Sequence, residues 1–224
     1  MENVLEQLAI CIERGKVNKD SKFPPDMQGQ DGADELTVKA IEQSHTANDI
    51  LKKSLMVGMK KVGDSFGAGK AYIPDLLIAA KAMNAAMEHL KVYFESGELK
   101  HRGTVVIGTV SGDLHDIGKN LIRMVLKGDG WNVIDLGADV SPEKFVEVIS
   151  ANPDCFVGLS ALLTTTMVNM KTTNDIIKLR HPNTKIYIGG APLSQDYSDK
   201  IGTDGYFPDP YSFAQHLSTL VSIN

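Results

Sequence analysis

The sequence predicts an α + α/β protein: an N-terminal four-helix bundle, then a flavodoxin- or Rossmann-like domain with a five-stranded parallel sheet. Two observations support this. Up to about residue 100, apolar residues recur at the three- and four-residue spacing of amphipathic helices. From Thr104 onward, short apolar runs alternate with helical patterns, which is typical of a parallel sheet covered on both faces. The polar segment 97–103 is the predicted boundary, which gives domains of residues 1–100 and 101–224.

Four helical patterns make up the first domain. The polar segment 16–32, which contains two prolines and two glycines, separates the first two patterns. The glycine-rich segment 63–70 is expected to end the third helix, and Pro74 fits the first turn of the fourth. Four such helices predict an up-down bundle. Their apolar faces contain Val4, Leu5, Leu8 and Ile12; Leu36, Ala40 and Ile41; Ile50, Leu51, Leu55, Met59 and Val62; and Leu76, Leu77, Ala80, Met83, Met87, Leu90 and Phe94.

Five short apolar runs in the second domain are candidate strands. Ser141 can cap the helix after the second run, with Pro142 in its first turn. The carboxyl ends of parallel strands meet at one edge of the sheet, where ligands of open α/β sheets bind. The predicted strands are Val105–Thr109, Asn132–Asp135, Cys155–Leu159, Lys185–Ile188 and Gly205–Phe207.

Composition excludes several classes of partner. The formal net charge is −5, and no dense Lys/Arg cluster suits a nucleic-acid backbone. The N-terminus has no signal-peptide pattern, and no apolar run approaches the roughly 18 residues of a membrane span. Cys11 and Cys155 are far apart and are expected to be free thiols. We therefore expect a cytoplasmic protein without nucleic-acid or membrane partners.

Polar and small residues follow three of the predicted strands, at the edge where ligands bind. A histidine preceded by an aspartate, as in Asp113-Leu114-His115, is the usual arrangement of a metal-ligating imidazole whose other ring nitrogen is held by a carboxylate. Taken singly, each segment also has an ordinary explanation as a surface histidine, a helix cap or a turn. The other two segments contain Ser160, Leu162, Thr164 and Thr166, and Gly189 and Gly190.

The spacing of these segments is more specific. Asp113, His115 and Gly118 form an Asp-x-His-x-x-Gly pattern, with 41 residues between Gly118 and Ser160 and 26 between Leu162 and Gly189. This resembles the cobalamin-binding signature of base-off/His-on corrinoid proteins. Residues 58–83 resemble the helical cap before that domain in methionine synthase and in corrinoid proteins of methanogen and acetogen methyltransferase systems. The resemblance covers about residues 34–210 and leaves residues 1–33 unexplained.

The resemblance implies a role for each matching residue. His115 would be the lower axial ligand of cobalt, Asp113 its hydrogen-bonding partner, and Thr166 would stand where the family usually has a serine bonded to that aspartate. Two cap residues, Phe66 and Ile73, match the apolar positions over the upper face of the corrin. The remaining cofactor-binding residues would be Asp116, Ile117 and Gly118 of the histidine motif, and Ser160, Leu162, Thr164, Gly189 and Gly190 around the slot for the dimethylbenzimidazole tail.

The resemblance also implies a function in one-carbon metabolism, in the demethylation reactions of methanogenesis or acetogenesis. Such a carrier takes a methyl group from a donor methyltransferase, holds it as methyl-Co(III), and passes it to a tetrahydrofolate-type or coenzyme M acceptor methyltransferase. The donor would be a methylamine, methanol, a betaine or a methoxylated aromatic. A (β/α)₈ barrel needs about 250 residues, so the chain would be a subunit without catalysis of its own. Its partners would be a donor-side barrel enzyme, an acceptor-side enzyme and a reductive activase for Co(II).

Three other interpretations stay open. The cobalamin subunit of an adenosylcobalamin mutase shares the histidine motif but lacks the helical cap. A cobalamin-dependent sensor adds an N-terminal helix-turn-helix, for which residues 1–33 are too short and too weakly basic. A flavodoxin-like interaction domain without cofactor would not explain the three-part spacing. The donor, the acceptor, the lower base, the oligomeric state and the role of residues 1–33 are left open.

Overall fold

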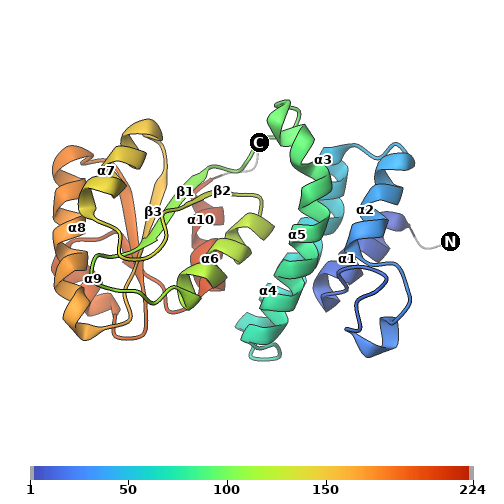
Figure 1. Ribbon diagram of the computed structural model, residues 1–224, viewed down its shortest axis with the longest axis horizontal. Helices are drawn as coiled ribbons and strands as arrows, with labels where there is room; N and C mark the ends of the chain where they lie inside the picture. Colours follow the sequence, from blue (N-terminus) through green and yellow to red (C-terminus); the bar gives the residue numbers. More distant parts are fainter. Residues whose placement is uncertain (1–2, 222–224) are drawn as a thin grey trace. The chain divides into compact units, whose positions relative to one another are not determined.

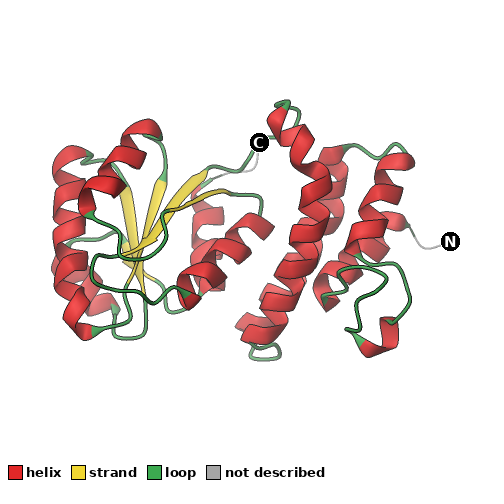
Figure 2. Ribbon diagram, in the orientation of Figure 1, coloured by secondary structure: helices red, strands yellow, loops and turns green. Residues whose placement is uncertain are grey.

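The structure, a computed structural model, describes residues 3–221, which divide into two compact units. The first unit contains the chain up to His101 together with Lys127–Gly130. The second contains Arg102–Leu126 and the chain from Trp131 onward. Helices alone build the first unit, whereas strands and helices alternate along the second (Figure 2). No helix within residues 3–221 is long and apolar enough to cross a membrane.

The first unit is a bundle of helices that pack on one another through a common apolar core. Helix α1 packs against α2, α4 and α5, and α5 also packs against α2 and α4. Leu8, Ile12, Leu55, Met83 and Leu90 are fully buried in this core. The elements are α1 (Val4–Arg14), the 3₁₀ turn η1 (Pro25–Met27), α2 (Ala33–Glu42), α3 (Ala47–Ile50), the π-helical segment η2 (Leu51–Leu55), α4 (Met56–Gly67) and α5 (Ile73–Glu95).

One feature of this unit differs from the sequence prediction, and a second adds to it. Helix α4 does not end at Gly63 but continues to Gly67. Glycine costs only about 1 kcal/mol inside a helix, and a Lys60–Asp64 ion pair one turn apart, with Nζ and Oδ2 2.8 Å apart, supports this last turn. Within the unexplained residues 1–33, Val4–Arg14 form α1, which supplies one wall of the bundle core.

The second unit contains one sheet of five parallel strands in the order β2-β1-β3-β4-β5. All five predicted strands are confirmed, and each end lies within one residue of its predicted position. The strands are β1 (Thr104–Thr109), β2 (Asn132–Asp135), β3 (Phe156–Ser160), β4 (Lys185–Gly189) and β5 (Gly205–Tyr206). The intervening elements are α6 (Ile117–Gly128), α7 (Pro142–Ala151), η3 (Thr164–Thr166), α8 (Met167–Arg180), α9 (Gln195–Ile201) and α10 (Pro210–Leu220).

Helices cover both faces of the sheet, as the near-continuous apolar strands require. Helices α6 and α10 lie on one face, where Leu126 and Phe213 pack against Ile107 of β1 (Figure 1). Helices α7, α8 and α9 lie on the other, where Phe145 and Ile177 are among the buried residues. The sheet is therefore buried between two apolar layers.

The strand order places a topological switch point between β1 and β3. From β1 the chain goes outward to β2 and then returns to β3 on the other side. The loops after β1 and β3 therefore leave the sheet in opposite directions, which opens a crevice at their carboxyl ends. The register aligns Thr109 with Ser160, and Ser160 with Gly189, so that the last residues of three strands lie in one row. The three polar segments of the predicted site follow directly from this row.

Candidate functional site

The loop after β1 brings Asp113 into the interior. Residues Val110–Asp113 form a turn closed by a hydrogen bond of 3.1 Å from the Asp113 N–H to the Val110 carbonyl. Gly112 has φ 81°, a left-handed conformation that suits glycine in the third position of such a turn. The turn directs the chain back towards the sheet, and Asp113 is fully buried. A buried carboxylate requires hydrogen-bond donors around both of its oxygens.

Asp113 has them. Its Oδ1 accepts from the backbone N–H of His115 at 3.0 Å and lies 2.9 Å from Nδ1 of the same residue. Its Oδ2 accepts from the N–H groups of Leu162 and Leu163, at 2.8 and 3.2 Å, and from the Thr166 hydroxyl at 2.8 Å. Burial by itself raises the pKa of Asp113, but these hydrogen bonds outweigh it and hold the pKa well below its usual range. Asp113 is therefore a carboxylate at neutral pH.

The carboxylate fixes the state of His115. Because an ionised Asp113 can only accept, Nδ1 of His115 carries the proton of this hydrogen bond, and Nε2 keeps its lone pair. Within residues 3–221 no group is hydrogen-bonded to Nε2, and the side chain is 49% exposed. The Thr109 hydroxyl holds the carbonyl of His115 at 3.0 Å. An imidazole oriented by a carboxylate, with its other nitrogen available, is the arrangement of a metal ligand.

Apolar side chains flank this imidazole at the surface. Leu114 is 76% exposed and Ile117 is 84% exposed, on either side of His115 in the loop. Leu162 and Leu163, whose backbones hold Asp113, are also exposed. Contiguous apolar surface on a folded protein marks a place where a ligand or partner binds.

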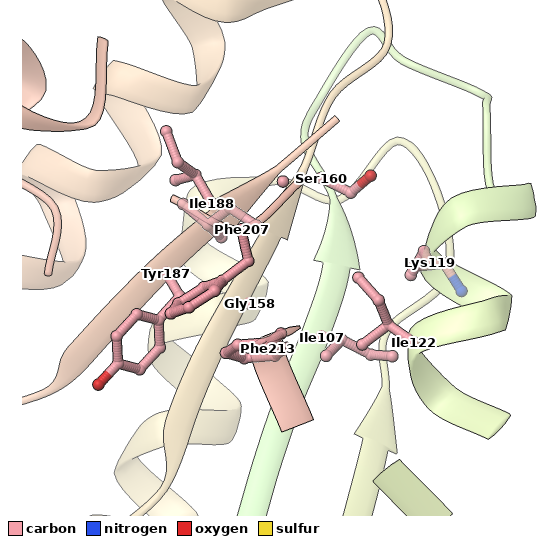
Figure 3. A pocket seen from close by; sticks show the side chains of 11 residues that line it. Ile107, Lys119, Ile122, Gly158, Ser160, Tyr187, Ile188, Phe207 and Phe213 are labelled. Carbon is pink, nitrogen blue, oxygen red and sulfur yellow. The ribbon is translucent and has the colours of Figure 1, made fainter. Parts of the chain in front are cut away.

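A narrow pocket with a volume of about 20 Å³ lies against the sheet, beside α6 (Figure 3). Ser160 and Gly189, both predicted to line a slot, lie in its wall, and the Tyr187 hydroxyl points away from it. Gly158 keeps the pocket open, because a Cβ there would come within 3.2 Å of Ile107. The complete lining is Ile107, Lys119, Ile122, Gly158, Leu159, Ser160, Tyr187, Ile188, Gly189, Phe207 and Phe213.

Most of this lining lies outside the three polar segments that follow the strands. Side chains alternate between the two faces along a strand, so the residues two positions before Ser160 and Gly189 lie on the same face of the sheet as these two. This alternation is the signal from which part of the lining could be predicted. That rule would have found Gly158 and Tyr187. The aromatic residues Phe207 and Phe213 come from β5's end and α10, and no local pattern connects them to the histidine loop.

Gly190 brings two loops together rather than lining the pocket. Its φ is 143°, and a Cβ at this position would lie 1.8 Å from the carbonyl oxygen of Ala161. Only glycine therefore permits the loop after β4 to approach the loop after β3 this closely. Leu162 and Leu163, which donate to Asp113, directly follow Ala161 in this loop.

The other predicted residues are placed as follows. Asp116 is exposed and accepts from the Asn120 side chain at 2.8 Å, and Gly118 lies in the first turn of α6 with open space around it. Thr164 begins η3 and is exposed, so Thr166 alone of the two contacts Asp113. Phe66, half-buried in the last turn of α4, and Ile73, 49% exposed at the start of α5, belong to the first unit. Their role over a corrin stays a prediction.

Comparison with known proteins decides which group this site serves. Residues 103–212 match the family described as B12 binding domain, and residues 29–91 match a second family of the same description. Trimethylamine corrinoid protein 1 of Methanosarcina acetivorans is 39% identical over 181 residues, which cover 77% of this chain and 84% of that protein. The chain belongs to the B12-binding corrinoid proteins.

Two solved structures extend the likeness. A cobalamin-binding protein from Desulfitobacterium hafniense is 32% identical, with a TM-score of 0.70 over 84% of this chain and 90% of that one. The methanol:cobalamin methyltransferase complex of Methanosarcina barkeri contains a chain 28% identical, with a TM-score of 0.80 over 99% of this chain and 80% of that one. The corrinoid family thus matches both halves of the sequence.

The residues present fit a corrinoid. Nε2 of His115 is an available nitrogen ligand for cobalt, held from behind by Asp113. The apolar side chains beside it suit the flat face of a corrin macrocycle. The lining of the pocket against the sheet, with the Ser160 hydroxyl and aromatic rings, has the chemistry that a flat heteroaromatic base needs, and the pocket would widen to admit a nucleotide tail.

Proposed function

We propose that this protein is a methyl carrier, which receives a methyl group from a donor methyltransferase and delivers it to an acceptor methyltransferase. The proposal rests above all on one observation. A buried, ionised Asp113 holds His115 in the tautomer whose Nε2 is available to a metal, at the switch point of the sheet. The chain would be a subunit of a methyltransferase system and would have no catalysis of its own.

The relatives support this reading and suggest the donor. The curated relatives include a trimethylamine corrinoid protein at 39% identity and a dimethylamine corrinoid protein at 41%, both from Methanosarcina acetivorans. The structural neighbour from Methanosarcina barkeri is part of a methanol:cobalamin methyltransferase complex. We therefore propose a methylated amine as the methyl donor, a barrel enzyme as the donor-side partner, and a reductive activase as a further partner.

The bound corrinoid would supply the cobalt that accepts and releases the methyl group. The protein's part is to bind, orient and protect. His115 would hold the lower axial position through Nε2, and Asp113 would keep the proton on Nδ1. Thr166 and the backbone of Leu162 would keep Asp113 ionised and in place. Leu114 and Ile117 would exclude water from that face of the macrocycle.

The pocket, once widened by movement of its side chains, would hold the nucleotide tail of the corrinoid. Its wall is apolar apart from Ser160 and Lys119, and three aromatic side chains offer faces to a heteroaromatic base. The ammonium of Lys119 is bound to both oxygens of Asp135, at 2.6 and 2.7 Å, so that its aliphatic chain is the part that lines the pocket. A base without charge would therefore bind best.

Cobalt ligation can be tested by spectroscopy of the reconstituted protein. In protein labelled with ¹⁵N-histidine, the Co(II) form with bound cobalamin should show an electron paramagnetic resonance spectrum with coupling to one ¹⁵N nucleus, which distinguishes a protein nitrogen from that of the cofactor's own base. His115→Ala should abolish this coupling. The control His181→Ala should retain it, because the His181 ring bonds to Ser150 at 3.1 Å, at the end of α8 and away from the loop after β1. Nitrogen coupling that persists in His115→Ala would contradict the proposal.

The carrier role needs a separate experiment. The reduced, cobalamin-loaded protein is mixed with a methyltransferase specific for trimethylamine, dimethylamine, methanol or glycine betaine and its ¹⁴C-methyl substrate. We expect the label to reach the protein with a methylated amine and not with the other donors. Labelling only from methanol or betaine would overturn the donor assignment, and labelling from none would overturn the carrier role.

A further inference from the structure

The turn before the Asp113–His115 pair is held from outside by a second carboxylate, that of Asp139. Asp139 lies in the loop between β2 and α7 and is exposed. Its Oδ1 accepts from the backbone N–H of Gly112 at 2.7 Å and from the Ser111 hydroxyl at 3.3 Å. Its own backbone N–H donates to the carbonyl of Asp113 at 3.0 Å. One residue thus bonds three consecutive residues of the turn.

The backbone of Asp139 adopts an uncommon conformation in which it makes these contacts. Its φ is 53°, a left-handed conformation that is uncommon outside glycine and that aspartate and asparagine tolerate best. The next residue, Val140, donates its N–H to the carbonyl of Thr109 at 2.9 Å and forms a parallel bridge with Val110. The loop after β2 therefore stays paired with the end of β1. This pairing places the Asp139 carboxylate against the turn.

Two other hydrogen bonds support the turn. The Asp113 N–H donates to the Val110 carbonyl at 3.1 Å, and Asn169 of α8 donates to the Ser111 carbonyl at 2.7 Å. The Gly112 N–H, by contrast, bonds to the Asp139 carboxylate. A hydrogen bond from a backbone N–H to a carboxylate is among the stronger ones in proteins. Gly112 precedes Asp113 directly, so movement of its peptide moves the carboxylate that orients His115.

We propose that Asp139 is a positioning residue for the cobalt ligand. By holding Ser111, Gly112 and the Asp113 carbonyl, it fixes the Asp113 carboxylate where it can bind Nδ1 of His115, which leaves Nε2 for cobalt. The inference rests on the proposed function of His115 and extends it to a residue in a different loop. Asp139 acts through the turn and not by contact with His115.

Three variants distinguish the effect of the Asp139 carboxylate from the effect of its backbone conformation. Asp139→Asn keeps an oxygen acceptor and the tolerance for positive φ, so it should behave as wild type. Asp139→Gly adopts the same φ without strain but has no acceptor. Ser111→Ala removes only the 3.3 Å hydrogen bond and should have little effect. Should the glycine variant not fold, Asp139→Ser, whose side chain is too short to reach Gly112, is measured in its place.

The first readout uses the protein without corrinoid. In Asp139→Gly, amide hydrogen exchange of Gly112 and His115 should become about tenfold faster, because a charge-assisted hydrogen bond is lost. Exchange at Ile186, whose N–H donates to the side chain of Asp204 just before β5, should not change. Nitrogen-15 spectra of the His115 ring should show one tautomer in wild type and Asp139→Asn, and a mixture of tautomers in Asp139→Gly.

The second readout uses the cobalamin-loaded protein. The fraction of Co(II) with nitrogen coupling should fall in Asp139→Gly and be restored in Asp139→Asn. Absence of coupling in wild type would mean that the proposed function itself is wrong. Wild-type coupling together with unchanged exchange, tautomer and ligation in Asp139→Gly would overturn the role of Asp139 alone.

Discussion

Replacement of Asp113 by asparagine should move the proton on His115 from one ring nitrogen to the other. Oδ2 of Asp113 faces two backbone N–H groups, from Leu162 and Leu163, so the new amide nitrogen cannot occupy that position. It must replace Oδ1, where it would point at the His115 ring. Nδ1 then has to accept, and the proton moves to Nε2. The nitrogen proposed to bind cobalt would lose its lone pair.

The cost in stability follows from the donors around Asp113. A hydrogen bond to a charged group contributes about 1.5–3 kcal/mol, and an unsatisfied donor costs about as much. The backbone N–H of His115 would lose its acceptor, and the three donors at Oδ2 would face a neutral oxygen. We expect the free energy of unfolding of the second unit to fall by about 3 kcal/mol.

Both effects are measurable on one protein. Trp131 is the only tryptophan in the sequence and is 1% exposed in the core of the second unit, so its fluorescence reports urea unfolding there. The matched control is Asp116→Asn in the same loop, which should change stability by less than about 0.5 kcal/mol because Asp116 is exposed. The Co(II) spectrum of Asp113→Asn should lack nitrogen coupling. An Asp113→Asn protein with wild-type stability and full coupling would refute the reasoning.

Three further substitutions test other parts of the second unit by urea unfolding. Gly190→Ala should lower the free energy of unfolding by at least about 3 kcal/mol. Gly202→Ala, at a positive φ with open space around it, should lower it by only about 1 kcal/mol. Equal losses would show that the close contact at Gly190 is relieved. Asp135→Asn leaves the Lys119 ammonium, whose side chain is 3% exposed, without its carboxylate and should cost about 3 kcal/mol. Lys119→Met, which keeps the aliphatic chain, should cost less, and the reverse order would contradict this. Burial raises the pKa of Asp204, but hydrogen bonds from two lysines outweigh burial and hold the pKa below its usual value. The ionised carboxylate therefore stabilises the fold above the unfolded pKa of about 3.9. This contribution is lost as the pH falls through the lower pKa of the folded state. Asp204→Asn should therefore be less stable than wild type near pH 6, with a difference that shrinks below about pH 4; a constant difference would argue against the shift.

The strands and the histidine motif could be predicted from the sequence because their signals are local. An apolar run such as Val105–Thr109 needs no distant partner to be recognised, and all five strands were found within one residue. Asp113 and His115 are two residues apart, so their pairing could be expected from a single loop. The helix end at Gly63 was wrong because a glycine marks a break only where packing and ion pairs do not offset its cost.

The sequence by itself therefore determined the order of elements, the parallel sheet and the position of the Asp113–His115 pair at a strand end. Tertiary structure decided what surrounds that histidine. The donors that keep Asp113 ionised lie 49, 50 and 53 residues away in the chain, and Asp139 is brought to the turn by the pairing of β1 with β2. The physical reason is that a hydrogen bond between loops depends on strand register and on close approaches such as that of Gly190 to Ala161, which periodicity along the chain does not encode.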